Sequence, residues 1–435
     1  MKRMLFGIYT GYEALSRGDL ERNLDLIQAH GINTIILTNS YSVSPEVQAL
    51  NPLGRLPRQT DAFADIRKAC ERRDLSLWLC VGVPYAECVQ RAVDYPSLAI
   101  RDVFGNIVEP DQSFGFRWSA SLCPSNPSIR GYLQALFRDL AKRYRPDGFT
   151  LTHLRFSPPS HSFLNLFSCF CPSCIDKASR LGYEPEKARK ELIKALEELK
   201  KLEAWKVRFL SEEGGSIHDM IQLLGLEEEA LRWFEFRAKI ITQNLASFHE
   251  AVKDVSPNTL FSCDNYPPSF AILSGHRYGD LERTGDFLSP LLNHPTIFQT
   301  LIFAEACKVL LEWNPSLKEA ELLKLLYGIL GYGDLGLPLS SSRLVGFQRR
   351  GDTFETEVSL PRLIKREAVK AKAISKGYKP LFLVLEAHAS LSKDEIKERI
   401  EAVRKVGFDG IFFTSFEGDL ASLEAIAEGL KDYGA

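Results

Sequence analysis

The sequence predicts a (β/α)8 barrel, because eight short apolar runs, most of them followed by helical segments, occur along its 435 residues. Polar side chains gather at the carboxyl ends of these runs, which is where barrel proteins place their sites. A doubly wound parallel sheet also alternates strands and helices, but eight units and this gathering of polar side chains favour the barrel. We expect residues 1–435 to form one barrel domain.

The first half of the predicted barrel is regular. Its apolar runs cover residues 4–12, 32–41, 75–85 and 148–156, and helical segments cover residues 19–31, 61–74 and 127–144. Gly31 supplies a stop signal for the first helix. Asn126 and Pro127 are typical of a helix start, and the apolar positions that follow keep the spacing of one buried face.

A long insertion, at residues 157–257, interrupts the alternation. It contains a cysteine cluster and two long charged helices near residues 186–212 and 226–255. These helices are long enough for a homo-oligomer interface, although their charge is more simply that of a solvated face. The remaining runs cover residues 259–266, 286–294, 381–388 and 411–418, with helices at 391–406 and 419–433.

Composition and charge exclude several classes of partner. The chain is 45% hydrophobic and 25% charged, as globular proteins are, and its formal net charge is -2. It therefore has no general attraction for nucleic acid or for anionic membranes. No stretch approaches the ~20 apolar residues of a membrane span, and the first residues contain no run suited to a signal peptide. We expect a cytoplasmic protein.

Three cysteines in 169-CFCPSC-174 lie on a predicted tight turn. Thiolates spaced in this way can converge on one metal ion about 2.3 Å from each sulfur. Cys123, in 122-LCPSNPS-128, is the expected fourth ligand, because the loops after the third and fourth strands of a barrel are neighbours. Four thiolates leave no open coordination position, which predicts a structural metal. Reduced thiols without metal and a redox centre are the alternatives, and C-x-C matches the C-x-x-C redox motif poorly.

The tract 123-CPSNPSIRGYLQALFRDLAKRYRPDGFTLTHLRF-156, followed by 169-CFCPSC-174, resembles glycoside hydrolase family 42 β-galactosidases and their clan. The resemblance covers the third and fourth barrel units by motif and the others by layout. Less characterised barrel families share the outlines of 286-DFLSPLLNH-294 and 384-VLEAH-388. The resemblance implies a structural Zn2+ bound by Cys123, Cys169, Cys171 and Cys174. It also implies a carbohydrate, or another small polar ligand, as the partner.

The resemblance further implies two catalytic carboxylates. Glu386 ends the seventh run, where the family places its nucleophile, and an ion-paired surface glutamate is the alternative. The family's strand-four acid falls on Leu154 and that of the related families on Thr152, so neither carboxylate is present. Asp264, after the fifth run, is the first candidate replacement, and Glu417, after the eighth, is the second. A retaining site needs its carboxyl groups about 5–5.5 Å apart.

Further candidates surround these carboxylates. Alternation places His153 and Arg155 on one face of the fourth run. His153 suits a proton donor with a pKa near the working pH, and Arg155 suits hydroxyls, a carboxylate or a phosphate. Arg155 paired with a neighbouring barrel acid is the alternative. The other expected substrate-binding residues are the polar Asn293, His294 and His388 and the aromatic platforms Tyr12, Tyr85 and Trp118.

Three functions remain open. The favoured one is a barrel enzyme that hydrolyses a glycosidic bond with Glu386 as a catalytic carboxylate. The second is a zinc-stabilised barrel that has lost hydrolysis and binds a sugar or a partner protein. The third is a metal-dependent hydrolase built on His153, His294, His388 and Asp264, although no H-x-H or H-E-x-x-H spacing supports it.

Overall fold

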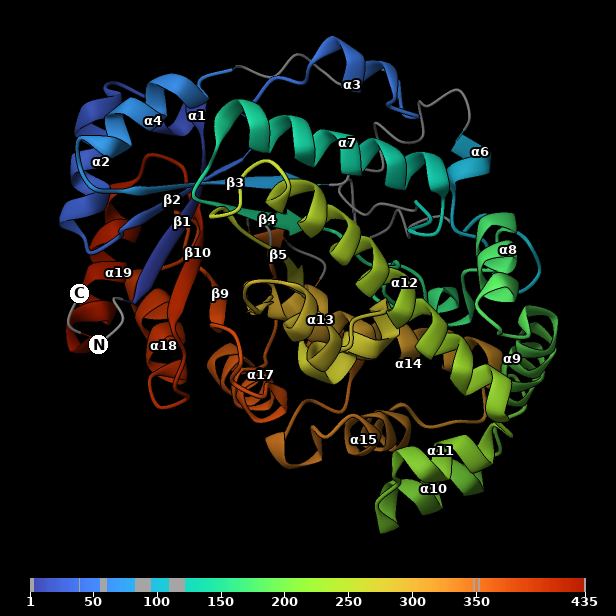
Figure 1. Ribbon diagram of the computed structural model, residues 1–435. Coiled ribbons are helices and arrows are strands. Elements are labelled where there is room, and N and C mark those ends of the chain that lie inside the picture. Colours follow the sequence, from blue (N-terminus) through green and yellow to red (C-terminus); the bar gives the residue numbers. More distant parts are fainter. Residues whose placement is uncertain are drawn as a thin grey trace.

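The computed structural model describes residues 4–38, 40–54, 61–82, 95–108, 122–346, 349–350 and 353–433. Eight strands form the central sheet in the order β6-β5-β4-β3-β2-β1-β10-β9, with parallel neighbours (Figure 1). Two bridges, Leu288–Leu381 and Leu291–Val384, bring β6 against β9. The sheet is therefore a nearly closed (β/α)8 barrel, and the predicted fold class is confirmed. The strands are β1 (Leu5–Gly11), β2 (Thr34–Thr38), β3 (Ser76–Gly82), β4 (Gly148–Thr152), β5 (Leu260–Asn265), β6 (Ser289–Pro290), β9 (Phe382–Glu386) and β10 (Gly410–Phe416).

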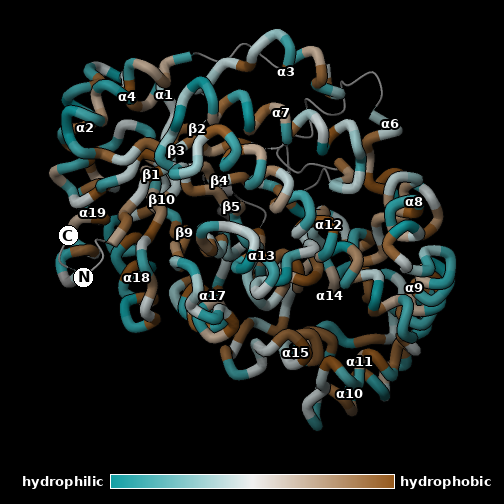
Figure 2. The backbone as a smooth tube through the Cα atoms, in the orientation of Figure 1, coloured by the Kyte–Doolittle hydropathy of each residue, from teal (hydrophilic) through white to brown (hydrophobic). Residues whose placement is uncertain are grey.

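Helices surround the strands and turn hydrophilic residues outward, as along α9 and α18 (Figure 2). The helices outside the insertion are α1 (Tyr12–Leu15), α2 (Leu20–Ala29), α3 (Pro45–Ala49), α4 (Phe63–Glu71), α6 (Tyr95–Leu98), α7 (Pro127–Tyr144), α13 (Tyr278–Thr284), α14 (Leu301–Trp313), α15 (Glu319–Ile329), α16 (Ser341–Leu344), α17 (Leu360–Ile374), α18 (Lys393–Val403) and α19 (Leu420–Leu430). A two-stranded ribbon joins β7 (Arg349–Arg350) to β8 (Thr353–Phe354). Short 3-10 turns occur at Phe163–Phe167, Pro268–Ser274, Gly333–Leu335 and Lys431–Tyr433, and a π-helical turn at Thr296–Thr300.

The start of α7 follows the expected chemistry. Asn126 is in an extended conformation, and its side-chain oxygen accepts hydrogen bonds from the backbone N–H groups of Ser128 and Ile129. Pro127 occupies the first turn, where its missing N–H costs nothing. The helix then buries its predicted apolar face against α12 and the barrel strands.

Aromatic side chains fill the amino-terminal end of the barrel interior. The Trp78 ring lies 5.3 Å from the ring of Phe287, 6.2 Å from that of Phe382 and 5.3 Å from that of Phe412, measured between centroids. Gly148 of β4 makes room for the indole, because a Cβ at this position would lie 2.4 Å from Trp78 Cδ2. This dense packing fills the amino-terminal end of the barrel with apolar rings and is consistent with a site at the opposite, carboxyl end of the strands.

The insertion between β4 and β5 contains α8 (Pro172–Arg180), α9 (Pro185–Leu199), α10 (Ala204–Glu213), α11 (Ile217–Leu223) and α12 (Glu228–Lys253). The predicted helix at 226–255 is confirmed as α12. The predicted helix at 186–212 is wrong, because the chain turns after Leu199 and Glu203 is extended. The turn lets α10 pack against α15 while α9 packs against α12.

Two strands end earlier than expected. The run at 148–156 is a strand only as far as Thr152, because His153 has a φ of 66°, in the left-handed region. The predicted alternation through Arg155 is therefore wrong beyond Thr152. The run at 286–294 contributes only Ser289–Pro290 as a strand. Among the helices of the described ranges, none has the length and apolar character needed to cross a membrane.

Candidate functional site

A cavity of about 280 Å3 lies at the carboxyl ends of the barrel strands. Six residues predicted from the sequence line it: His153, Arg155, Asp264, Asn293, His294 and His388. Residues from β1, β2, β3 and β10 complete the wall, so the cavity is assembled from most of the barrel. A larger cavity of about 640 Å3 lies at α16, α17 and α18 and takes none of its described wall from the barrel strands. The cavity at the strand ends is therefore the candidate active site.

Asp264, on β5, is a buried carboxyl group at the cavity wall. Its Oδ1 accepts hydrogen bonds from Thr150 Oγ1 at 2.9 Å and from the Tyr9 hydroxyl at 3.3 Å. Burial raises the pKa of Asp264 to about 6, against the opposing effects of the threonine hydrogen bonds and the Arg155 charge. A carboxyl group with this pKa can hold and release a proton near neutral pH.

Glu386, the last residue of β9, is a second buried carboxyl group and is 1% exposed. Its Oε1 is 3.2 Å from His294 Nδ1 and 3.2 Å from His388 Nε2. Burial alone would raise the pKa of Glu386, but the two histidines and the Arg399 charge outweigh burial and lower the pKa to about 2. Glu386 is therefore ionised at neutral pH. Among the described wall residues of the cavity, its partners His294 and His388 are present and Glu386 is not.

The contacts around Glu386 indicate the tautomers of the two histidines when their rings are neutral. The backbone N–H of Ser390 donates to His388 Nδ1 at 3.3 Å, so the proton of a neutral ring is on Nε2, which faces Glu386. An ionised carboxylate only accepts, so His294 carries a proton on Nδ1. Nη2 of Arg399, on α18, lies 3.5 Å from Glu386 Oε2. Glu386 therefore orients two imidazoles toward the cavity and is itself balanced by an arginine.

His153 and Arg155 follow β4 in the irregular backbone that begins at the positive φ of His153. Burial, together with the charges of Arg155, His161 and His294, holds the pKa of His153 well below its usual range. His153 is therefore neutral near pH 7, whereas the sequence suggested a proton donor. Arg155 is buried and its guanidinium lies 5.5 Å from the Tyr266 ring centroid and 5.8 Å from that of Phe298.

Of the other predicted site residues, one lies at the cavity wall, two do not, and two fall outside the described ranges. Asn293 is buried at the cavity wall, and its Oδ1 has no hydrogen-bond partner among the described residues. Tyr12 begins α1 and packs against the core, and Glu417 is exposed; neither lies among the described wall residues. Tyr85 and Trp118 lie outside the described residues.

Sequence reasoning missed several residues of the site. Tyr9 and Thr150 bind Asp264, Tyr266 and Phe298 flank Arg155, and Arg399 contacts Glu386. Tyr9 could have been found from its place near the end of the first apolar run. Arg399 lies in an ordinary charged helix, and no sequence signal distinguishes it from its solvated neighbours.

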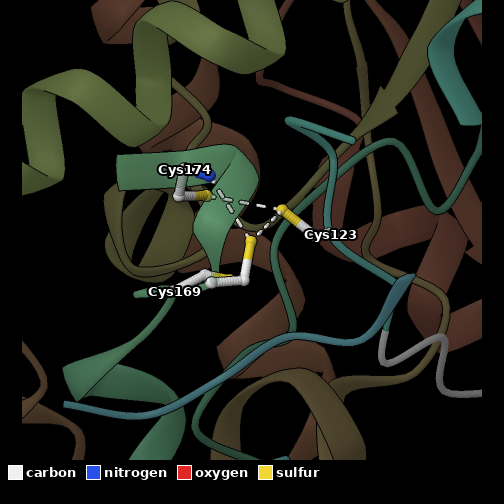
Figure 3. A group of neighbouring side chains, drawn as sticks. Cys123, Cys169 and Cys174 are labelled. Carbon is white, nitrogen blue, oxygen red and sulfur yellow. Dashed lines mark hydrogen bonds between the residues drawn. The ribbon is translucent and has the colours of Figure 1, made fainter. Parts of the chain in front are cut away.

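The predicted cluster of four cysteines is confirmed. The thiols of Cys123, Cys169, Cys171 and Cys174 are all buried, and their sulfur atoms lie within 4.8 Å of one another. Figure 3 shows Cys123, Cys169 and Cys174 converging from separate segments. Cys123 Sγ lies 3.4 Å from Cys174 Sγ and 3.3 Å from Cys171 Sγ. These separations approach the edges of about 3.8 Å expected for four thiolates around an ion about 2.3 Å away.

The surroundings of the cluster suit negative charge. The backbone N–H of Arg101 donates to Cys169 Sγ at 3.4 Å, and that of Cys174 donates to Cys171 Sγ at 3.4 Å. Arg237 of α12 is fully buried; burial lowers the pKa of Arg237 to about 10, against the opposing influence of Cys169 and Cys174. The donor set therefore fits a metal ion held by thiolates. Across the described residues this is the one cluster with metal-ligand geometry, so no second site supports the metal-dependent hydrolase.

No protein-family model matches the chain, and no curated protein matches its sequence. Solved structures do match. The glycoside hydrolase domain of PgaB (BpsB) from Bordetella bronchiseptica superposes with a TM-score of 0.57 at 12% identity, over 99% of this chain and 98% of that chain. The catalytic domain of β-amylase from Paenibacillus polymyxa gives 0.51 at 10% identity, over 99% and 97%. A β-galactosidase from the Antarctic haloarchaeon Halorubrum lacusprofundi gives 0.52 at 11% identity, over 99% of this chain and 58% of that chain.

These likenesses define the class of fold. The chain folds as a TIM-like (β/α)8 barrel that resembles the catalytic domains of glycoside hydrolases, β-galactosidases among them. At 10–12% identity the likeness concerns the fold, and function has to be argued from the site itself.

Proposed function

We propose that this protein is a glycoside hydrolase that cleaves a glycosidic bond in the cavity at the strand ends, using Asp264 and Glu386 as its two carboxyl groups. The observation that carries the proposal is geometric: Asp264 lies at the cavity wall and Glu386 contacts two wall histidines, and their surroundings move the two pKa values apart, to about 6 and about 2. Glycosidases need one protonated and one ionised carboxyl group at the same pH, and such a divergence makes Asp264 the protonated group and Glu386 the ionised one. The barrel fold supplies the expected setting.

Asp264 is the general acid. Its protonated form donates a proton to the glycosidic oxygen as the bond between that oxygen and the anomeric carbon breaks, which leaves Asp264 ionised. The hydrogen bonds from Thr150 and Tyr9 to Oδ1 then stabilise the carboxylate.

Glu386 acts through His294. The carboxylate holds the Nδ1 proton of His294, which leaves Nε2 as the basic nitrogen of this cavity residue. His294 removes a proton from the attacking water, and Glu386 stabilises the resulting imidazolium. Attack by water predicts inversion at the anomeric carbon. Direct attack by Glu386 would give retention and would require the two histidines to move aside.

A panel of aryl glycosides tests this function. We expect Asp264→Asn and Glu386→Gln each to lower kcat/KM by about 100-fold or more, since general acid–base catalysis contributes about 10²–10⁴-fold. Glu417→Gln, in an exposed glutamate away from the cavity, is the matched control and keeps full activity. NMR of the first-formed anomer reads the stereochemistry. Equal activity in wild type and both carboxyl variants would overturn the assignment.

For the cysteine cluster we propose a structural Zn2+ ion. Cys123, Cys169, Cys171 and Cys174 would hold it with all four positions filled, so the ion would stabilise the fold and take no part in the reaction. Elemental analysis should find about one zinc per chain. Cys171→Ser should reduce this content, while Cys307→Ser, in a buried cysteine outside the cluster, should not.

A second function has specific support. Thr152 stands where the related families carry an acid, and two histidines separate Glu386 from the cavity. Both observations suit a barrel that binds carbohydrate without cleaving it. Calorimetric binding of a sugar by the wild-type protein, with no turnover of any aryl glycoside over long incubation, would favour this function over hydrolysis.

A further inference from the structure

Arg155 is a buried cation at the wall of the cavity. Arg155 is 7% exposed. It lies three residues after the end of β4 and lines the cavity. Tyr266 and Phe298 lie beside the guanidinium at 5.5 and 5.8 Å from their ring centroids. Aromatic rings stabilise a cation only in part, and a guanidinium removed from water normally takes a carboxylate or phosphate partner. Among the described residues, Arg155 forms no ion pair.

The charges of Asp264 and Arg155 act on each other, but the two side chains form no direct ion pair. Directly paired carboxylates elsewhere in the chain have lowered pKa values: Lys253 Nζ lies 2.8 Å from Asp286 Oδ2, and hydrogen bonds from His249 and Lys253 overcome burial there. At Asp264, burial wins over Arg155 and the pKa rises to about 6. The hydrogen bonds of Asp264 go to hydroxyl groups instead.

The other charges of the site are already balanced. Glu386 lies 3.5 Å from Arg399 and contacts two imidazoles. Its negative charge is therefore balanced by these groups and not by Arg155. When Asp264 is protonated, Arg155 is the uncompensated charge of the cavity. Two polar atoms of the same cavity wall, Asn293 Oδ1 and Thr414 Oγ1, are buried with no hydrogen bond among the described residues.

We infer that the natural ligand of this cavity is a sugar bearing an anionic group, and that Arg155 binds this group. A guanidinium offers two parallel N–H donors. A carboxylate, a phosphate and a sulfate can each accept both donors with a pair of oxygen atoms. Asn293 and Thr414 would take the hydroxyls beside it. The bound anion also favours the protonated form of Asp264, which is the form that a general acid requires.

That the ligand is a sugar rests on the proposed function, whereas its negative charge rests on Arg155 alone. Binding of monosaccharides therefore separates the two, because it requires no bond cleavage. Isothermal titration calorimetry at low salt compares glucuronate, galacturonate, glucose 6-phosphate and glucose 6-sulfate with neutral glucose and galactose. The charged arms distinguish the carboxylate, phosphate and sulfate sources of the anion.

We expect at least one charged sugar to bind about 10- to 100-fold more tightly than its neutral counterpart, the range of a hydrogen bond to a charged group. Arg155→Met should remove this preference and Arg155→Lys should keep part of it. Arg138→Met is the matched control, since Arg138 is half-exposed and pairs with Asp254 at 2.9 Å on the surface. It should leave the preference intact.

Three results would overturn the inference: equal or tighter binding of the neutral sugars, no binding of any charged sugar, or a preference that survives Arg155→Met. The first two use the wild-type protein and do not depend on a variant that folds. A hydrolase that prefers neutral glycosides would refute the anionic ligand and leave the proposed hydrolysis standing. Tight binding of a charged sugar without turnover of any glycoside would support the anionic ligand and refute the proposed hydrolysis.

Discussion

Replacing Asp264 with asparagine should lower the proposed activity by about 100-fold or more and yet stabilise the protein at neutral pH. The carboxyl group lies among Tyr9, Thr150 and Thr152, with Cys80 and Cys263 nearby, and Arg155 is the cation that acts on it. Burial raises its pKa from an ordinary 3.8 to about 6. That difference corresponds to about 3 kcal/mol, at about 1.4 kcal/mol for each pKa unit.

The sign of the effect follows from proton binding. Between pH 3.8 and about 6 the folded protein keeps the Asp264 proton while the unfolded chain has lost it. The free energy of unfolding therefore falls as the pH rises through this window and is level above it. Asparagine does not titrate, so Asp264→Asn removes this fall. Relative to wild type, the variant should gain about 3 kcal/mol between pH 4 and pH 8.

Thermal unfolding can measure this gain. For 435 residues, an unfolding entropy of about 2.1 cal/mol/K per residue gives about 0.9 kcal/mol/K, so the gain corresponds to about 3 °C in Tm. Asp254→Asn, at an exposed aspartate, is the control: it measures how the loss of one surface carboxylate changes the Tm. Tm curves for wild type and Asp264→Asn that run parallel from pH 4 to pH 8 would refute the claim that burial controls this carboxyl group.

Three further predictions concern stability. Glu386→Gln should lower the free energy of unfolding by about 3–5 kcal/mol, because it leaves Arg399 buried beside a neutral amide; unchanged chemical denaturation would contradict this. Gly148→Ala should cost about 1–3 kcal/mol, because the added methyl group meets the Trp78 ring at 2.4 Å; a Tm equal to that of wild type would show that the barrel can adjust. A strong chelator should lower the Tm of wild type and leave that of Cys171→Ser unchanged, as differential scanning fluorimetry can show.

The sequence predicted the architecture better than the details of the site. Apolar runs buried on both faces produce parallel strands, so the strands lie close to their expected positions, apart from the early end of β4 and the short β6. The C-x-C-x-x-C spacing and Cys123 came together because neighbouring barrel loops meet. The end of β4 could not be predicted, since a φ of 66° at His153 is set by tertiary packing and not by local propensity.

The relations among charges were the least visible part of the site. The sequence indicated Glu386, Asp264 and Arg155, but a list of residues does not show which cation faces which anion. Arg399 contacts Glu386 from a helix whose sequence resembles a solvated surface segment, and hydroxyl groups bind Asp264. How deeply each charged side chain is buried decides which groups pair, and this burial depends on how helices and strands pack.

The cysteine cluster also has a consequence for chain entropy. Cys123 precedes α7 and Cys169 follows β4, so a metal ion bound by both closes a ring that contains His153 and Arg155. Closing the ring removes disorder from the unfolded chain, and it ties the irregular backbone after β4 at both ends. α9, α10 and α11 lie outside the ring. Sequence change in those helices should therefore be tolerated, whereas an oxidant that reaches the thiols should loosen the backbone at the carboxyl ends of the strands first.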